Sequence, residues 1–224
     1  LRCRDLVIGY GGKPLLPPVS LTVEQGAFWA VLGRNGAGKS SFFKTLLGLL
    51  SPVSGHLEQP SGPVRIAYLA QRLAFDELCP LQARDVVASG TVRGWSFLRP
   101  GNDRKVVDDA MEAVGVSDLA ASAFRSLSGG QKQRVLFARM LATGARVVLL
   151  DEPTVGMDAV AEREVMDLLN DLKDRYGLTI IVVTHYLDVA EKHAEHVLFL
   201  DRDDQKVVVG SAAEVFAHAA FANR

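Results

Sequence analysis

The chain has 224 residues, 48% of them hydrophobic and 23% charged, which is typical of one globular domain, or of a domain with a small inserted lobe, and excludes extensive disorder. Its 25 basic and 26 acidic side chains give a formal net charge of -1, so we expect no nucleic-acid partner. Two cysteines are too few for a disulfide framework or a cysteine-based zinc site. The apolar runs are too short to cross a bilayer and the amino terminus lacks the apolar core of a signal peptide, so the sequence predicts a soluble, cytoplasmic domain.

The first third of the chain predicts a buried strand followed by a helix. Residues 28–32 form a continuous apolar run that ends at Gly33, and a helical pattern begins at Lys39. Such a run is typical of a strand buried on both faces of a parallel sheet. Residues 73–145 differ, because they contain no strong strand run and show helical periodicity at Val107, Ala110, Met111 and Val114. We predict a mostly helical lobe, inserted into a core formed by residues 1–72 and 146–224.

The last third predicts the remainder of an α/β core. The apolar runs at 147–150 and 179–183 have the character of buried strands. The segment between them carries a helical stripe of Val165, Leu168, Leu169 and Leu172. Gly177 is the expected end of this helix, and the order strand, helix, strand implies a right-handed crossover. Two apolar runs, at 197–200 and 207–209, then predict a strand hairpin before a short helix.

The connection between the first strand and the first helix fits the phosphate-loop pattern G-x-x-x-x-G-K-[ST]. Glycines let successive backbone amides turn inward around an anion, and the following helix adds the partial positive charge of its amino terminus. Lys39 supplies a full charge for the terminal phosphates, and Ser40 offers a hydroxyl to Mg²⁺. The alternative is a glycine-rich turn with a solvated lysine. The segment reads Gly33, Arg34, Asn35, Gly36, Ala37, Gly38, Lys39 and Ser40.

Two carboxylates follow the apolar run at 147–150. Asp151 falls at the carboxyl edge of the predicted parallel sheet, where such sheets bind ligands, so we expect it near the phosphate loop, holding Mg²⁺. Side chains alternate along a strand, so Glu152 is expected to point elsewhere, which suits the separate task of activating the attacking water. The alternative is an acidic strand end without a chemical role, which the phosphate loop makes less favoured.

The segment Leu127–Arg134 carries a third pattern, LSGGQKQR. Ser128 and Gln131 have the spacing of a capping box, and Gly129 and Gly130 in the first helical turn leave amides open to an anion. Alone, this pattern would describe an ordinary capped helix. Together with the two preceding motifs, it strongly resembles the signature motif of ATP-binding cassette (ABC) ATPases.

The resemblance covers nearly the whole chain and implies the fold of that family. This fold is an α/β P-loop NTPase (RecA-like) core with an inserted, mostly helical subdomain and an antiparallel β subdomain near the amino terminus. It implies hydrolysis of ATP with Mg²⁺, with metal binding by Ser40, Gln71 and Asp151. It implies catalytic roles for Lys39, Gln71, Glu152 and His185. Nucleotide binding is assigned to the phosphate loop and also to Tyr10, Ser41, Ser128, Gly129, Gly130, Gln131 and Asp158.

Four of these residues have ordinary alternatives. Tyr10 lies where the family places an aromatic ring on adenine, and a strand-edge tyrosine would look the same. Gln71 matches the glutamine that reaches Mg²⁺ and the attacking water, where a lone glutamine after a strand would otherwise be solvent-exposed. It follows Ala70 where the family usually has proline, which leaves the stiffness of its loop open. Asp158 matches the loop that contacts the partner subunit, although its context Val-Gly-Met-Asp departs from the usual Ser-Ala-Leu-Asp, and it is also a candidate N-cap. His185 matches the histidine that contacts the γ-phosphate, where a lone strand-end histidine would otherwise be structural.

The resemblance also implies partners. Two copies are expected to pack head to tail, with ATP between Lys39 of one copy and Ser128 of the other. A transmembrane permease subunit is expected on the helical lobe, with an extracytoplasmic substrate-binding protein in the same system, so this chain would lie at the inner face of the membrane. Apolar residues of the lobe either line the permease groove or pack in the core; they are Leu73, Phe75, Leu78 and Val86.

Residues 71–90, 156–159 and 209–216 look like those of bacterial zinc and manganese importers, although none of them is a ligand for the cargo. Import of another substrate such as an iron chelate, a soluble ATPase in DNA maintenance or on the ribosome, and a non-hydrolysing nucleotide sensor are the alternatives. Long coiled-coil insertions and a second cassette, usual in the soluble ATPases, are not found, and intact Lys39 and Glu152 argue against the sensor. His193 and His196 have no nearby third metal ligand, so we assign them to a solvated helix face and a strand start.

Overall fold

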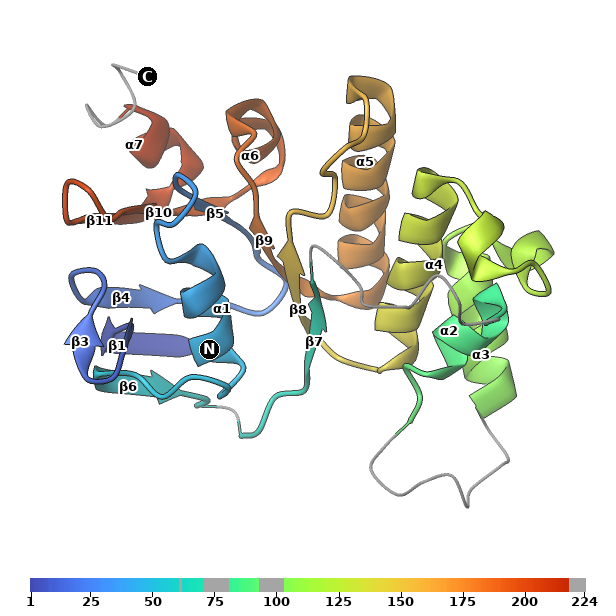
Figure 1. The fold of residues 1–224 in the computed structure, drawn as a ribbon, viewed down its shortest axis with the longest axis horizontal. Helices are drawn as coiled ribbons and strands as arrows, with labels where there is room; N and C mark the ends of the chain where they lie inside the picture. Colours follow the sequence, from blue (N-terminus) through green and yellow to red (C-terminus); the bar gives the residue numbers. More distant parts are fainter. Residues whose placement is uncertain (61, 71–80, 93–102, 218–224) are drawn as a thin grey trace.

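The structure, a computed structural model, describes residues 1–60, 62–70, 81–92 and 103–217 (Figure 1). Its strands are β1 (Arg2–Val7), β2 (Gly9–Tyr10), β3 (Lys13–Pro14), β4 (Val19–Thr22), β5 (Phe28–Leu32), β6 (Ser54–Glu58), β7 (Ile66–Leu69), β8 (Val147–Asp151), β9 (Thr179–Val183), β10 (His196–Asp201) and β11 (Lys206–Ser211). Its α-helices are α1 (Lys39–Leu46), α2 (Ala83–Ala88), α3 (Asp103–Ala113), α4 (Gly129–Ala142), α5 (Ala159–Tyr176), α6 (Leu187–His193) and α7 (Ala212–Ala217). Short 3-10 helices cover Ser117–Leu119 and Phe124–Ser126.

A six-stranded sheet forms the centre of the molecule, in the order β11-β10-β5-β9-β8-β7. The five strands from β10 to β7 are parallel, and β11 is added antiparallel through the hairpin with β10. The predicted strands at 28–32, 147–150 and 179–183 are confirmed as β5, β8 and β9, and the predicted hairpin is confirmed as β10 and β11. All five residues of β5 and of β9 are buried, as expected for strands covered on both faces.

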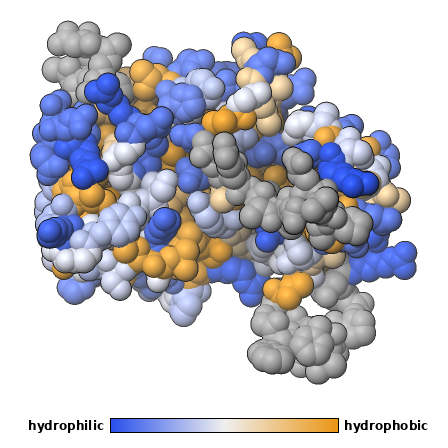
Figure 2. All heavy atoms as spheres, viewed as in Figure 1, coloured by the Kyte–Doolittle hydropathy of each residue, from blue (hydrophilic) through white to orange (hydrophobic). Residues whose placement is uncertain are grey.

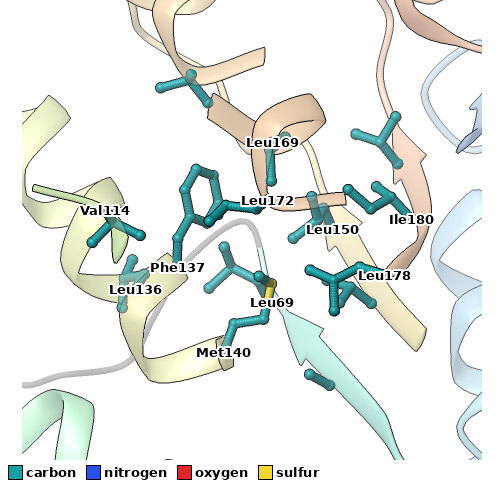
Figure 3. Close-up of a cluster of buried hydrophobic side chains, with 14 of the residues drawn as sticks. Leu69, Val114, Leu136, Phe137, Met140, Leu150, Leu169, Leu172, Leu178 and Ile180 are labelled. Atoms are coloured by element: carbon teal, nitrogen blue, oxygen red, sulfur yellow. The ribbon is translucent and has the colours of Figure 1, made fainter. Parts of the chain in front are cut away.

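Alternate side chains of these strands pack into two different cores. Leu150 of β8 and Ile180 of β9 face α4 and α5, where Figure 3 shows them beside Phe137, Leu169 and Leu172. Their neighbours along the strands face α1 and the amino-terminal sheet, in a second cluster that includes Phe42, Phe43, Leu149 and Ile181. Helices therefore cover both faces of the sheet (Figure 1), which confirms the α/β class.

A separate three-stranded antiparallel sheet, β4-β1-β6, lies near the amino terminus. Buried residues of β1 and β4, Cys3, Leu6 and Val19, share one apolar cluster with Phe43 of α1. This sheet confirms the antiparallel β part of the fold that the family resemblance implied, and it supports the helix that follows the phosphate loop.

The helices between residues 83 and 142 gather at one end of the central sheet (Figure 1). The predicted periodic residues Val107, Ala110, Met111 and Val114 are buried in the core that also contains Phe137 of α4. Val86 is 0% exposed and packs in this core, so core packing rather than a surface groove is its observed environment. Leu73, Phe75 and Leu78 lie outside the described residues.

Both ends of α5 follow from local chemistry. Asp158 is its N-cap, and one carboxylate oxygen accepts from the backbone amides of Val160 and Ala161 at 3.0 and 2.9 Å. Gly177 ends the helix in a left-handed conformation, with φ 61°, as its position in the sequence predicted. The buried face consists of Val165, Met166, Leu169 and Leu172, and Leu168 of the predicted stripe is only half-buried.

His193 and His196 have the predicted places, on helix α6 and at the start of β10, but differ from expectation in their exposure. Both are half-buried rather than solvated. The Nδ1 atom of His193 lies 2.6 Å from Asn170 Nδ2, and the ring of His196 stacks on Trp29 with 4.7 Å between the centroids. Packing against α5 and β5 explains their positions.

Hydrophilic residues cover most of the face seen in Figure 2, and hydrophobic residues show through in separate patches. In the described part of the chain, no helix has both the length and the apolar character needed to span a bilayer.

Candidate functional site

The phosphate loop lies between the end of β5 and the start of α1, as the motif predicted. Gly38 is the N-cap of α1 with φ 102°, a left-handed conformation that favours glycine. No side chain caps the first turn, so its backbone amides are free to face a ligand. Gly33 passes so close to the backbone of Leu200 that a Cβ atom would collide with the carbonyl oxygen. The two glycines thus let the loop turn tightly beside β10.

The side chain of Lys39 folds over this loop. Its Nζ atom donates to the carbonyl oxygens of Gly33 at 2.6 Å and Arg34 at 3.1 Å, and the residue is only 6% exposed. Burial lowers the pKa of Lys39, and the negative charges of Glu152 and Asp151 oppose that shift. The ammonium is therefore held by weak neutral acceptors beside two carboxylates, where a phosphate would bind it more strongly.

A cavity of about 560 Å³ opens in front of the loop. Asp151 and Glu152, at the carboxyl end of β8, border it together with Tyr10 from the amino-terminal hairpin. The predicted residues that line it are Tyr10, Asn35, Gly36, Gly38, Lys39, Ser40, Ser41, Asp151 and Glu152. A larger cavity, of about 770 Å³, lies at the opposite ends of β8 and β9 and contains none of the predicted site residues.

Asp151 lies within reach of two hydroxyl groups. Its Oδ2 atom is 3.2 Å from the Tyr68 hydroxyl and 3.5 Å from Ser40 Oγ. Burial raises the pKa of Asp151, and the Tyr68 hydrogen bond is the largest of the effects that oppose this rise. Burial also raises the pKa of Tyr68 to about 12, with a further contribution from the charge of Asp151, so the tyrosine remains a hydrogen-bond donor at neutral pH. Asp151 thus has the position that the sequence predicted.

Glu152 corrects one expectation. Strand alternation predicted that it would point away from the environment of Asp151, but both residues line the same cavity. The reason is that β8 ends at Asp151 and Glu152 has φ 50°, a left-handed conformation that is uncommon for a residue with a side chain. Glu152 Oε1 lies 3.7 Å from His185 Nδ1, so two of the four residues with expected catalytic roles are neighbours, and one of them lines the cavity.

Two nucleotide-binding candidates lie at the edge of the site. Tyr10 is 49% exposed, and its hydroxyl is 3.0 Å from Ser41 Oγ. Its ring is thus fixed at one end and open to the solvent over much of its area. Arg34 points outward and pairs with Asp203 at 3.7 Å, while Ala37 is buried beneath the loop.

Some predicted residues lie outside this cavity. Ser128 is the N-cap of α4, and its capping box with Gln131 is confirmed by hydrogen bonds of 2.9 and 3.3 Å. Gly129 and Gly130 form the first turn of α4, and neither the signature segment nor Asp158 lines the cavity. Gln71 lies outside the described residues.

Sequence reasoning missed Leu15, Tyr68 and Arg202. Leu15 and Arg202 line the cavity, and Tyr68 contacts its metal-binding candidate Asp151. Leu15 and Arg202 belong to connections that carry no motif. Tyr68 carried no local signal for this contact either, because its approach to Asp151 depends on the parallel pairing of β7 with β8.

Comparison with known proteins identifies the family. A family profile described as "ABC transporter" matches residues 16–155. The chain belongs to the ABC transporter family. The manganese transport system ATP-binding protein MntB of Bacillus subtilis (strain 168) is 37% identical over 219 residues, covering 95% of this chain and 86% of that protein. The zinc transport system ATP-binding protein TroB of Treponema pallidum (strain Nichols) is 36% identical over 230 residues, covering 98% and 86%.

The fold of this ABC ATPase is also similar to solved structures. The structure of cbiO1 from Clostridium perfringens, part of the ABC transporter complex cbiONQ, matches with a TM-score of 0.85 and 29% identity, over 99% of this chain and 91% of that one. Family membership means that this ABC transporter subunit binds ATP and couples its hydrolysis to transport, together with a transmembrane permease. The P-loop NTPase fold predicted from the resemblance is thereby confirmed.

Proposed function

We propose that this ABC ATPase powers the import of a transition-metal ion, zinc or manganese. The support for the cargo is the family membership together with relatives whose names specify manganese and zinc transport, at 37% and 36% identity over nearly the whole chain. The support for the chemistry is one observation, that Lys39, Asp151 and Glu152 from two separate motifs border the same cavity. Import of an iron chelate is the second candidate for the cargo.

The residues of the cavity and His185 have separate tasks in hydrolysis. The loop amides and Lys39 bind the phosphates of ATP, and the exposed ring of Tyr10 stacks on the base. Glu152 accepts a proton from the attacking water, and His185, whose Nδ1 atom lies 3.7 Å from Glu152, orients that carboxylate and contacts the γ-phosphate. The left-handed backbone of Glu152 holds its side chain toward the loop. Together these groups position the water and stabilise the charge that develops on the phosphate.

The oxygen donors present fit Mg²⁺. Ser40 Oγ and Asp151 Oδ2 are 3.5 Å apart at the edge of the phosphate loop, and a hydroxyl with a carboxylate is a usual donor set for this hard cation. Bound there with the nucleotide, Mg²⁺ would neutralise phosphate charge. We assign Gln71 to the same site by its place in the motif.

The site needs a second copy of the chain. Within the signature segment Ser128–Gln131, the capping box uses the amides of Ser128 and Gln131 and leaves those of Gly129 and Gly130 for a ligand, but the segment does not line the cavity of its own chain. A head-to-tail homodimer would bring this segment and Asp158 of one copy to the ATP held by Lys39 of the other. Hydrolysis would then remove the shared γ-phosphate and open the dimer.

A test of both the site and the dimer uses Glu152→Gln. We expect this variant to bind ATP but to hydrolyse it at least about a hundredfold more slowly, because a general base contributes about 10²- to 10⁴-fold. It should therefore elute as a dimer in saturating MgATP during size-exclusion chromatography. The double variant Lys39→Ala, Glu152→Gln is the control, and it should remain monomeric because it loses the phosphate contact. A Glu152→Gln protein that stays monomeric with bound ATP contradicts the proposed dimer.

The cargo is tested in a reconstituted system. We expect the chain to copurify in detergent with a multi-span permease, peripheral on the inner face of the membrane, and to act with an extracytoplasmic binding protein. In vesicles with these partners, zinc or manganese should stimulate ATP hydrolysis. The ion should also accumulate on the side of the membrane opposite the binding protein. Stimulation by a ferric chelate alone would transfer the proposal to the second candidate. Copurification with ribosomes or nucleic acid instead of a permease would refute the transport role.

A further inference from the structure

The hydroxyl of Tyr68 makes a contact that no nucleotide-binding motif explains. Tyr68 lies on β7, the last strand of the six-stranded sheet, and β7 pairs in parallel with β8. In this register Tyr68 is opposite Leu149, two residues before Asp151. Side chains two residues apart on a strand share a face, and a tyrosine reaches its diagonal neighbour on the adjacent strand. The pairing of β7 with β8 therefore directs Tyr68 toward Asp151.

The opposite faces of the same strands support this geometry. Leu69 and Leu150, the sequence neighbours of Tyr68 and Asp151, both point into the cluster beside Phe137 (Figure 3). Tyr68 and Asp151 consequently project to the other side of the sheet, which α1 covers. There the ring of Tyr68 meets Phe43 of α1 edge-on, with 6.2 Å between the centroids and an interplanar angle of 88°.

The ring contact and the hydroxyl have separate tasks. Phe43 is 0% exposed and belongs to the helix that begins at Lys39, so it fixes the ring of Tyr68 relative to the phosphate loop. The hydroxyl then donates to Asp151 Oδ2 at 3.2 Å, the same oxygen that Ser40 Oγ approaches to 3.5 Å. One carboxylate oxygen is thus held between the loop and β7, with the rotation of the carboxyl group restricted.

We propose that Tyr68 is a positioning residue, whose hydroxyl fixes the Asp151 carboxylate for metal binding beside the phosphate loop. This inference rests on the proposed metal-binding role of Asp151. It assigns to Tyr68 an effect on the binding of Mg²⁺ with the nucleotide, not on the binding of nucleotide alone. Through Tyr68, β7, which precedes Gln71 in the sequence, would then hold the Asp151 carboxylate in place.

The test removes only the hydroxyl, with Tyr68→Phe, and leaves the edge contact with Phe43. We expect the free Mg²⁺ concentration that half-saturates ATP hydrolysis to rise about tenfold, since loss of a group that orients a metal ligand typically weakens metal binding 10- to 100-fold and Tyr68 is 37% exposed. Binding of a fluorescent ATP analogue in EDTA should be unchanged. The matched control is Tyr176→Phe, because Tyr176 is exposed at the end of α5, and its Mg²⁺ dependence should equal that of the parent.

The variant Asp151→Asn separates the proposed metal-binding role of Asp151 from the proposed positioning role of Tyr68. The ratio of analogue affinities with and without Mg²⁺ is measured for the parent, Tyr68→Phe, Asp151→Asn and the double variant. If Tyr68 acts through Asp151, adding Tyr68→Phe to Asp151→Asn should change this ratio less than twofold. An Asp151→Asn protein with the parental ratio refutes the metal role of Asp151. A normal Asp151 effect with no effect of Tyr68→Phe, or an equal effect of Tyr68→Phe in both backgrounds, refutes the positioning role alone.

Discussion

Asp158 combines a structural and a functional assignment, and the substitution Asp158→Ala separates them. Its carboxylate accepts hydrogen bonds from the amides of Val160 and Ala161 at 3.0 and 2.9 Å. It also places a negative charge at the positive end of α5, which is 18 residues long. Loss of an N-cap costs about 0.5–2 kcal/mol. Because Asp158 is exposed, water replaces part of the lost interaction, and we expect a decrease of about 1 kcal/mol in the free energy of unfolding.

The measurement is thermal or urea unfolding of the nucleotide-free chain. A loss of about 1 kcal/mol corresponds to a decrease of about 2–4 °C in Tm for a chain of this size. Asp158→Asn keeps a capping oxygen and should lose less than half of that. The matched control is Asp171→Ala, which removes an exposed aspartate from the interior of the same helix and should not lower Tm. A parental Tm for Asp158→Ala, or an equal decrease for Asp171→Ala, would refute the capping argument.

Two further predictions concern a glycine and a thiol. Gly33→Ala places a Cβ against the carbonyl oxygen of Leu200, so it should lower the unfolding midpoint and abolish ATP binding in a filter assay. In the control Gly129→Ala the Cβ meets open space in a helix, where alanine is favoured over glycine, so the midpoint should not decrease. Equal midpoints for the two variants would contradict the clash. Burial raises the pKa of Cys3 to about 12, so in a Cys79→Ser background its alkylation at pH 8 should be about a thousandfold slower in the native chain than in urea. Because ionisation of this thiol opposes folding, the free energy of unfolding should decrease as the pH rises above about 8.5, and native labelling as fast as in urea would show that Cys3 is not buried.

Hydrophobic periodicity predicted most of the central sheet. The runs at 28–32, 147–150 and 179–183 are β5, β8 and β9, because a strand covered by helices on both faces must be apolar at every position. The helix that ends at Gly177 was equally readable, since its cap and its stripe are local patterns. By contrast, β1 and β6 alternate weakly and β4, although it alternates, has only four residues. Only the family resemblance anticipated their antiparallel sheet.

The candidate site divides in the same way. The loop from Gly33 to Ser40 and the pair at Asp151 and Glu152 were recognisable, because each is a contiguous motif at the end of an apolar strand. The direction of Glu152 was not, because alternation holds only while the strand continues and the backbone turns left-handed at this residue. The left-handed backbone at Glu152 thus turns its side chain toward the cavity, whereas regular strand geometry predicted that it would point away.

Residue order alone therefore determined which chemical groups this ATPase carries and on which elements they lie, because glycines, caps and apolar runs act over a few neighbouring residues. The tertiary structure decided which of those groups meet. Tyr68 and Asp151 are 83 positions apart, and their contact depends on the register of β7 against β8 and on the packing of Phe43 above them. Such contacts arise from the pairing of distant strands, which no local pattern encodes.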